Sequence, residues 1–417
     1  MILQGILGLG TILLIAYLFS EARSAISVKT LVMGLIIHVS LAIILLKIPI
    51  FKEFFLLLNQ VVMILAQATT AGTSFVFGYL GGGDPPFTVQ QPQWSFILAF
   101  KALPLLLVMS ALSAVLYYYR ILPLLVQFFS WLLEKSLHIS GTVGLGAAAN
   151  AFMGMVEAPL LIKPYLSKMS RDEIFAVMVA GMSTIAGTMM VLYANILAHH
   201  IPEAMGHILT ASLLNVISAL IIALIMVPQL NQASSARIKL PRLASSMMDA
   251  IVTGTTDGVK LLINIMAMLI VLVALVDLVN QILQLLPPFH EQPLTLQRIL
   301  GLIMAPLTFL MGIPYQEIVT AGSLMGTKVI LNELIAYVDL ANLPENALQP
   351  KSRLIMMYAM CGFANMGSLG IMIGGMTAMV PEKRDEIVSL GMKSILAGVL
   401  ATSFTATVVG LILSFQF

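Results

Sequence analysis

Long apolar stretches dominate this sequence and restrict what it can fold into. About twenty consecutive apolar residues are enough to cross a bilayer as a helix. Apolar residues make up 59% of the 417 positions and charged residues only 10%, whereas soluble domains carry about 25% charge. We therefore predict an all-α polytopic membrane protein with about eight transmembrane helices. The candidate spans lie near residues 2–19, 27–47, 96–118, 172–197, 206–227, 254–284, 354–379 and 388–415.

Two further apolar segments, 141–166 and 298–340, are interrupted by Gly, Pro and acidic residues. Segments 50–70 and 121–137 are expected to be interfacial helices, and the Gly- and Pro-rich stretch 79–94 is expected to form a loop. Placing most Lys and Arg residues in the cytoplasm requires eight crossings, both termini outside, and two re-entrant hairpins. The pattern hairpin–span–span then occurs twice in opposite orientations, which is the inverted repeat of secondary transporters.

This pattern divides the chain into five parts. We expect residues 1–140 to form N-terminal scaffold spans, 141–228 a first transport repeat, 229–252 a cytoplasmic linker, 253–297 a long scaffold span with its connection, and 298–417 a second transport repeat. In secondary transporters the substrate binds near the bilayer midplane, where helices are interrupted.

Glu157 and Glu333 each lie within one of the interrupted segments. A carboxylate near the centre of a membrane helix costs about 2.5–3.5 kcal/mol even on lenient insertion scales. Intramembrane acids usually face a polar cavity and touch a ligand or a cation. The alternative is that one of them caps a hairpin turn or lies at the interface.

Helix-weakening residues surround the first acid and recur in the spans that follow. Gly154 permits close backbone approach, and Pro159 removes a donor and disturbs the preceding turn. Backbone carbonyls freed in this way bind cations such as Na⁺. Asn150 and Thr184 offer neutral oxygens, although Asn150 also suits an inter-helix hydrogen bond and Thr184 a bond to its own helix. Similar breaks are expected at Ser183, Thr184, Gly187 and Thr188, and at Asn365, Gly367 and Ser368.

Several functional classes are disfavoured by the sequence. It contains no P-loop, GxSxG, HExxH or CxxC motif, so neither primary pumping nor catalysis as an enzyme is expected. The net charge of +2 indicates no nucleic-acid partner. A passive channel would need a continuous polar path, whereas the polar residues here gather near the two interrupted segments.

Six motifs, in this order along nearly the whole chain, resemble the signatures of concentrative nucleoside transporters. The chain is identified as a member of that family by "GTSFVFG", "AAANAFMGMVEAPLLIKPYL", "STIAGT", "MGIPYQE", "LNELIAY" and "CGFANMGSLGI". The resemblance implies a homotrimer in the bacterial cytoplasmic membrane. It also implies uptake of nucleosides coupled to Na⁺ or H⁺, with a mobile transport domain that contains two hairpins.

The resemblance also implies roles for individual residues. Glu333, Asn365 and Ser368 match the positions that hold the ribose hydroxyls, Phe363 packs beside the nucleoside, and Glu157 lies at the base. The Na⁺ ligands correspond to the side chains of Asn150 and Thr184 and the carbonyls of Met153 and Ile185. Proton-coupled relatives tend to lose the Asn, so the presence of Asn150 favours Na⁺ as the coupling ion, and no organic cofactor is implied.

The chain departs from the family pattern where the nucleobase is contacted. Many members have Gly-Gln-Thr/Ser-Glu, whereas this chain has Gly154, Met155, Val156 and Glu157. A Met wall leaves no amide unpaired and can yield to a larger ring. Members that prefer purine nucleosides resemble this chain in having Gly-Met there and Thr at the position of Thr188, which Met189 follows. We therefore expect a preference for purine nucleosides; the alternatives are an H⁺-coupled symporter with another base preference, a passive channel and a nucleoside sensor.

Overall fold

The computed structural model describes residues 2–88, 97–137, 139–198, 200–201, 203–229, 244–288 and 293–415. Within these residues the secondary structure is helical throughout. Seven helical segments are long and apolar enough to cross a membrane, which agrees with an all-α polytopic protein. Most of the predicted 79–94 loop is described, but its last six residues, and most of the predicted 229–252 linker, lie outside the described residues.

In the described part of its first third, the chain forms six α-helices. They are α1 (Ile2–Leu18), α2 (Val28–Lys47), α3 (Pro49–Phe77), α4 (Leu98–Lys101), α5 (Leu105–Tyr118) and α6 (Ile121–Leu137). One expectation is corrected here. Residues 50–70 belong to the 29-residue helix α3, which continues into an apolar segment long enough to cross a membrane. This helix ends at Phe77, and Gly78 follows it with a positive φ of 60°.

Two similar sets of helices follow, separated by one long helix. The first set contains α7 (Gly141–Asn150), α8 (Glu157–Leu161), α9 (Lys163–Leu166), α10 (Arg171–Ser183), α11 (Gly187–Leu197) and α12 (Ala204–Met226). The long helix is α13 (Met247–Leu283). The second set contains α14 (Leu296–Leu310), α15 (Ile318–Ile330), α16 (Glu333–Asn342), α17 (Pro350–Met360), α18 (Met366–Met379) and α19 (Arg384–Ser414).

The two sets repeat one plan. In the first, α7 packs on the preceding helix α6, a break separates α7 from α8, and a second break separates α10 from α11. In the second, α14 packs on α15, a break separates α15 from α16, and another separates α17 from α18. The second hairpin is therefore α15–α16, and the 298–310 part of the predicted broken segment belongs to α14, the counterpart of α6. The predicted breaks inside both spans are present.

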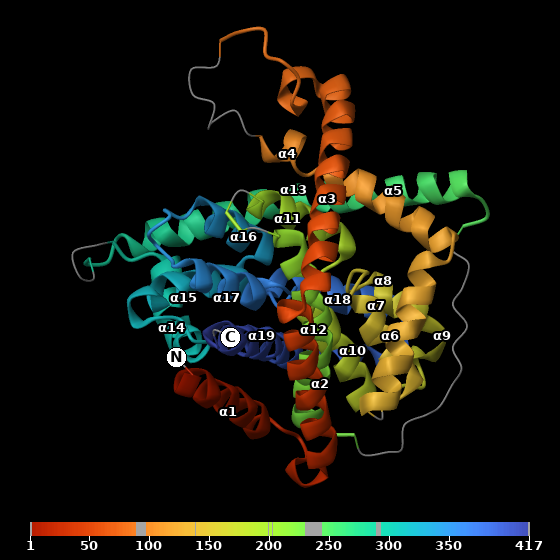
Figure 1. The fold of residues 1–417 in the computed structure, drawn as a ribbon, viewed down its shortest axis with the longest axis vertical. Coiled ribbons are helices and arrows are strands. Elements are labelled where there is room, and N and C mark those ends of the chain that lie inside the picture. Colours follow the sequence, from red (N-terminus) through yellow and green to blue (C-terminus); the bar gives the residue numbers. More distant parts are fainter. Residues whose placement is uncertain are drawn as a thin grey trace.

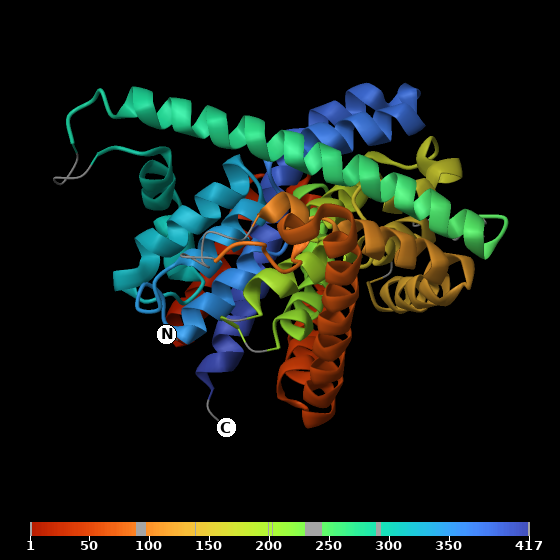
Figure 2. The same cartoon turned by 90° about the horizontal axis from the view of Figure 1, so that it is seen from above.

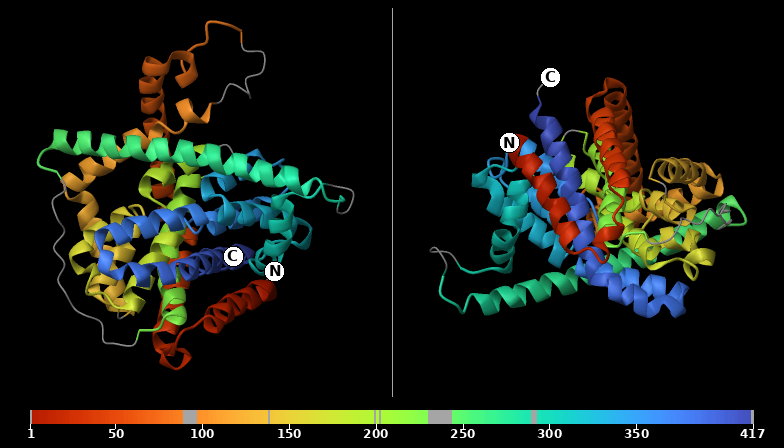
Figure 3. Two further views of the ribbon diagram at one scale, coloured as in Figure 1. Left: turned by 180° about the vertical axis from the view of Figure 1, so that it is seen from behind. Right: turned by 90° about the horizontal axis from the view of Figure 1, so that it is seen from below.

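Helices α10, α12 and α19 form the centre of the molecule and pack on one another (Figure 1). Nearly every residue of α10 and most residues of α12 and α19 are buried. By contrast, α13 crosses the outside of the molecule along its whole width, as the views from above and behind show (Figures 2 and 3). Only Ala250, Gly254, Gly258 and Val276 of its 37 residues are buried.

Helix α13 is held against α5 by small residues. A Cβ atom at Gly254 would lie 2.7 Å from the carbonyl oxygen of Ser110, and one at Gly258 would lie 3.1 Å from Ser110 Cβ. Such close backbone approach is how small residues join membrane helices. The α5–α13 pair therefore forms one wall of the molecule.

Candidate functional site

Each hairpin places its acid at the start of its second helix. Glu157 is the first residue of α8, and Glu333 is the first residue of α16. Glu157 Oε2 accepts a hydrogen bond from the backbone N–H of Gly154 at 2.8 Å. Asn332 caps α16 by accepting from the N–H of Ile335 at 2.9 Å. Each hairpin is thus interrupted between its two helices, within an apolar segment, and places a carboxylate at this interruption.

Glu333 is buried and is held by two side chains from different helices. Its Oε1 accepts from the hydroxyl of Tyr193 on α11 at 2.6 Å, and its Oε2 accepts from Nδ2 of Asn365 at 2.9 Å. Asn365 in turn caps α18 by accepting from the N–H of Ser368 at 2.7 Å. This network fixes the carboxylate, and charge-assisted hydrogen bonds of this kind are among the stronger ones in proteins. Sequence reasoning found Asn365 and Ser368 but missed Tyr193, because nothing in the sequence places α11 beside hairpin 2.

A cavity of about 250 Å³ lies where the two hairpins, the two broken spans and α13 meet. Both Glu157 and Glu333 line it, so the two acids share one chamber. All nine residues expected to bind the substrate line this cavity: Met155, Val156, Glu157, Thr188, Met189, Glu333, Phe363, Asn365 and Ser368.

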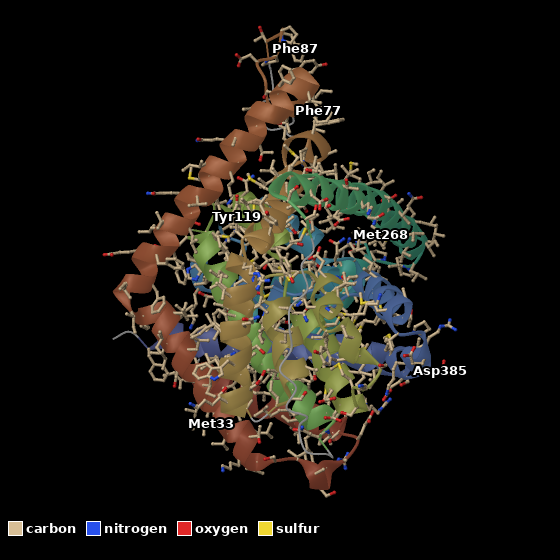
Figure 4. All side chains as sticks on the ribbon, turned by 90° about the vertical axis from the view of Figure 1, so that its right-hand side faces the viewer. Met33, Phe77, Phe87, Tyr119, Met268 and Asp385 are labelled. Carbon is tan, nitrogen blue, oxygen red and sulfur yellow. The ribbon has the colours of Figure 1, made fainter. Side chains whose placement is uncertain are left out.

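Helix α13 supplies a wall of the cavity that sequence reasoning missed. Leu261, Asn264, Ile265, Met268 and Leu272 line it, and Figure 4 shows Met268 on this stretch of the helix beside the C-terminal helices. These residues recur at spacings of three and four, so they lie on one face of α13. That periodicity is visible in the sequence, but only the packing of α13 across the repeats shows that this face looks into the chamber.

The four predicted cation ligands gather at the break of the first repeat. Asn150 is fully buried; its Nδ2 donates to the carbonyl of Gly146 at 2.9 Å, and its Oδ1 has no hydrogen-bond partner among the described residues. A Cβ atom at Gly181 would lie 3.5 Å from this Oδ1, which therefore faces α10 near its end. Thr184, also buried, donates its hydroxyl to Ala180 at 2.8 Å, so its oxygen lone pairs stay available. A buried acceptor without a donor, beside the negative end of a helix dipole, suits a cation.

The remaining two predicted ligands lie in the adjoining breaks. Met153 belongs to the segment between α7 and α8, and the buried Ile185 to the segment between α10 and α11. A hydrogen bond of 2.9 Å from the N–H of Gly187 to the carbonyl of Phe152 joins the two segments. A cation at this point would therefore contact hairpin 1 and the broken span together.

The two breaks in the spans also touch each other. The N–H of Phe363 donates to the carbonyl of Thr184 at 3.3 Å, and a Cβ atom at Gly362 would lie only 2.7 Å from the carbonyl oxygen of Ser183. Asn215 of α12 donates to the carbonyl of Cys361 at 2.6 Å. The breaks that carry the predicted substrate-binding side chains and the predicted cation ligands are therefore joined by backbone hydrogen bonds and close backbone contacts.

A buried lysine occupies the second repeat near its break. Lys328 of α15 is fully buried, and its ammonium donates to the carbonyl of Ala359 at 2.8 Å and to Thr402 Oγ1 at 3.0 Å. Ala359 lies in the last turn of α17, where helix carbonyls lack helical partners and favour positive charge. Sequence reasoning overlooked Lys328, although a lysine in an apolar helix is itself a signal.

Comparison with known proteins decides the family. Residues 7–80 match the family described as Na⁺ dependent nucleoside transporter N-terminus, 99–199 match a nucleoside recognition family, and 207–410 match the Na⁺ dependent nucleoside transporter C-terminus. The chain is 34% identical to the nucleoside permease NupC of Helicobacter pylori, over 98% of this chain and 97% of the relative. The chain belongs to the concentrative nucleoside transporter family.

Other relatives and solved structures also match nearly the whole length of this chain. Sodium/nucleoside cotransporter 2 of Rattus norvegicus is 29% identical over 97% of this chain, which covers 62% of that longer protein. Solved structures of CNTnw in an inward-facing substrate-bound state and in an outward-facing state are each 31% identical over 99% of this chain and 98% of that one, with TM-scores of 0.90 and 0.89. This concentrative nucleoside transporter is a multi-pass protein of the bacterial inner membrane, not an enzyme. The predicted family and the all-α polytopic fold class are confirmed.

Proposed function

We propose that this protein imports nucleosides together with Na⁺ and prefers purine nucleosides. The observation that carries the proposal is that all nine predicted substrate residues, both acids included, line one cavity where the hairpins meet. A nucleoside carries vicinal ribose hydroxyls, which suit a fixed carboxylate with a neighbouring amide and hydroxyl. Glu333, Asn365 and Ser368 form such a group, and Phe363 supplies an aromatic face beside it.

Na⁺ binds at Asn150 and Thr184, with the carbonyls of Met153 and Ile185 completing the set. The unpaired, buried Oδ1 of Asn150 supports this assignment, because Na⁺ is bound by neutral oxygens and carbonyls of unwound helices. An ion there orders the break that carries Met155, Val156 and Glu157. Nucleoside then binds more tightly with Na⁺ present, and by linkage Na⁺ binds more tightly with nucleoside present.

The purine preference follows from the apolar base wall. Met155 and Val156 replace polar side chains, so a larger ring meets a deformable surface that leaves no hydrogen-bonding group unpaired. Met189 at the start of α11 continues that wall, and Thr188 beside it adds one hydroxyl.

Movement of the two repeats against the α5–α13 wall carries the site across the membrane. The first transport repeat is 141–228 and the second is 298–417, and 1–140 and 253–297 form the scaffold. Three copies assemble through scaffold surfaces; the broad exposed apolar face of α13 is suited to this, as its few buried residues indicate.

The test is uptake of labelled adenosine, inosine and uridine by proteoliposomes. We expect uphill accumulation with an inward Na⁺ gradient, little uptake in choline buffer, and faster uptake of the two purine nucleosides. If none of the three nucleosides is transported, the proposed substrate class is refuted. Uptake driven equally by a proton gradient in Na⁺-free buffer would instead establish an H⁺-coupled symporter, and equilibration without accumulation would establish a passive channel.

A further inference from the structure

The base side of the cavity has one hydrogen-bonding side chain, the hydroxyl of Thr188. Met155 and Val156 occupy the hairpin wall, and neither side chain has a strong donor or acceptor. Nucleobases carry polar groups along their edges, and a polar group removed from water without a partner weakens binding. One hydroxyl cannot match a base edge that carries several polar groups, so a further polar partner from another wall of the chamber is needed.

Most polar side chains of the cavity are already committed. Glu333 and Asn365 bond to each other, Asn332 caps α16, and Glu157 accepts from the backbone of Gly154. The hydroxyls of Thr188 and Ser368 and the amide of Asn264 on α13 are different, and of these three only Asn264 carries a carboxamide. It lines the cavity, and among the described residues its amide has no hydrogen-bond partner.

The surroundings of Asn264 suit a flat ring. Leu261 and Ile265 line the cavity beside it, and Met268 follows one turn later on the same face. The amide thus stands within an apolar stripe, opposite the repeats that carry the ribose site. The Asn264 side chain is exposed in the chamber, so it can meet a base that enters. A bound base lying on these apolar neighbours would take the amide out of water and thereby strengthen their hydrogen bonds.

We propose that Asn264 is a specificity-determining residue that binds the edge of the nucleobase. A carboxamide presents one acceptor and two donors, and it pairs in bidentate fashion with the amino group and N7 of adenine. The base is then recognised by Asn264 on α13, whereas the ribose is held by the hairpin and the broken span of the second repeat. This inference rests on the proposed function, because it requires that the cavity binds a nucleoside.

The experiment is competition against labelled adenosine uptake by proteoliposomes under an inward Na⁺ gradient, with three unlabelled competitors. They are adenosine, 7-deazaadenosine, which lacks N7, and purine riboside, which lacks the amino group. For the unmodified protein we expect adenosine to compete about tenfold better than either analogue. For Asn264→Leu we expect the three competitors to become equal within about twofold.

Two further variants keep the test decisive. Met268→Leu alters the same face of α13 without removing a polar group, so it should keep the ranking of competitors. Asn264→Asp keeps an acceptor for the amino group but loses the donor to N7, so it should keep the preference over purine riboside and lose that over 7-deazaadenosine. If Asn264→Leu is not inserted, the Asp variant alone decides the question.

The outcomes separate this inference from the function on which it rests. An unmodified protein that transports adenosine but does not distinguish the three competitors would overturn the role of Asn264. An Asn264→Leu variant with the original ranking would overturn it as well. An unmodified protein that neither transports nor binds any nucleoside would instead refute the proposed function.

Discussion

Substitution of Tyr193 by Phe tests whether Glu333 is held in place for the substrate. The Tyr193 hydroxyl donates to Glu333 Oε1 at 2.6 Å, and both residues are buried. A hydrogen bond to a charged group contributes about 1.5–3 kcal/mol. Since Asn365 still holds the other oxygen, we expect the lower end of this range, which corresponds to about tenfold weaker nucleoside binding.

The assay is isothermal titration calorimetry of adenosine and of 3′-deoxyadenosine in Na⁺ buffer. Loss of affinity should be large for adenosine and small for the deoxy analogue, because the analogue lacks a hydroxyl for Glu333 to bind. Tyr337→Phe is the matched control. Tyr337 is equally buried and stacks on Tyr193 with ring centroids 4.7 Å apart, but its hydroxyl donates to the carbonyl of Met357 at 2.9 Å. Unchanged adenosine affinity in Tyr193→Phe, or an equal loss in both variants, would refute the reasoning.

Three other perturbations follow from the structure. Asn150→Ala removes the unpaired buried oxygen, so the Na⁺ concentration for half-maximal uptake should rise at least about tenfold; an unchanged Na⁺ dependence would place the ion elsewhere. Gly362→Ala would place a Cβ against the carbonyl of Ser183, whereas the Cβ of Gly370→Ala would meet nothing within 4 Å. Thermal melting should show destabilisation of about 1–3 kcal/mol for Gly362→Ala only, and equal melting temperatures of the two variants would argue against contact between the breaks. The hydrogen bond from Arg171 and then that from Lys393 lower the pKa of Glu21 from its ordinary 4.5 to about 2. The stabilisation from these two ion pairs is present above pH 4.5 and is lost as the pH falls towards 2. Glu21→Gln should therefore narrow the difference in melting temperature between pH 7 and pH 3, by a modest amount because the site is largely exposed. A difference as large as in the unmodified protein would contradict the ion pairs.

Much of the fold could be predicted because the bilayer limits the choices. Backbone groups must be satisfied within each segment in lipid, so long apolar stretches form helices. The predicted ranges of α2 and α12 agree with the structure within a few residues, whereas the predicted span 96–118 is divided into α4 and α5. The breaks at Thr184 and before Met366 were also predictable, because Gly, Ser, Thr and Asn interrupt otherwise apolar spans there. The extent of α3 was misjudged, because its polar residues between Asn59 and Thr73 resemble those of an interfacial segment.

The sequence by itself determined the class of protein, the two repeats and the two acids, because a carboxylate in an apolar hairpin is costly wherever the chain folds. Tertiary structure alone decided which side chains meet. It brings Tyr193 to Glu333 across 140 positions of sequence, leaves the Asn150 oxygen unpaired against α10, and turns the Asn264 face of α13 towards the chamber. Such contacts depend on how helices cross, and helix crossing is set by the packing of whole surfaces rather than by any local run of residues.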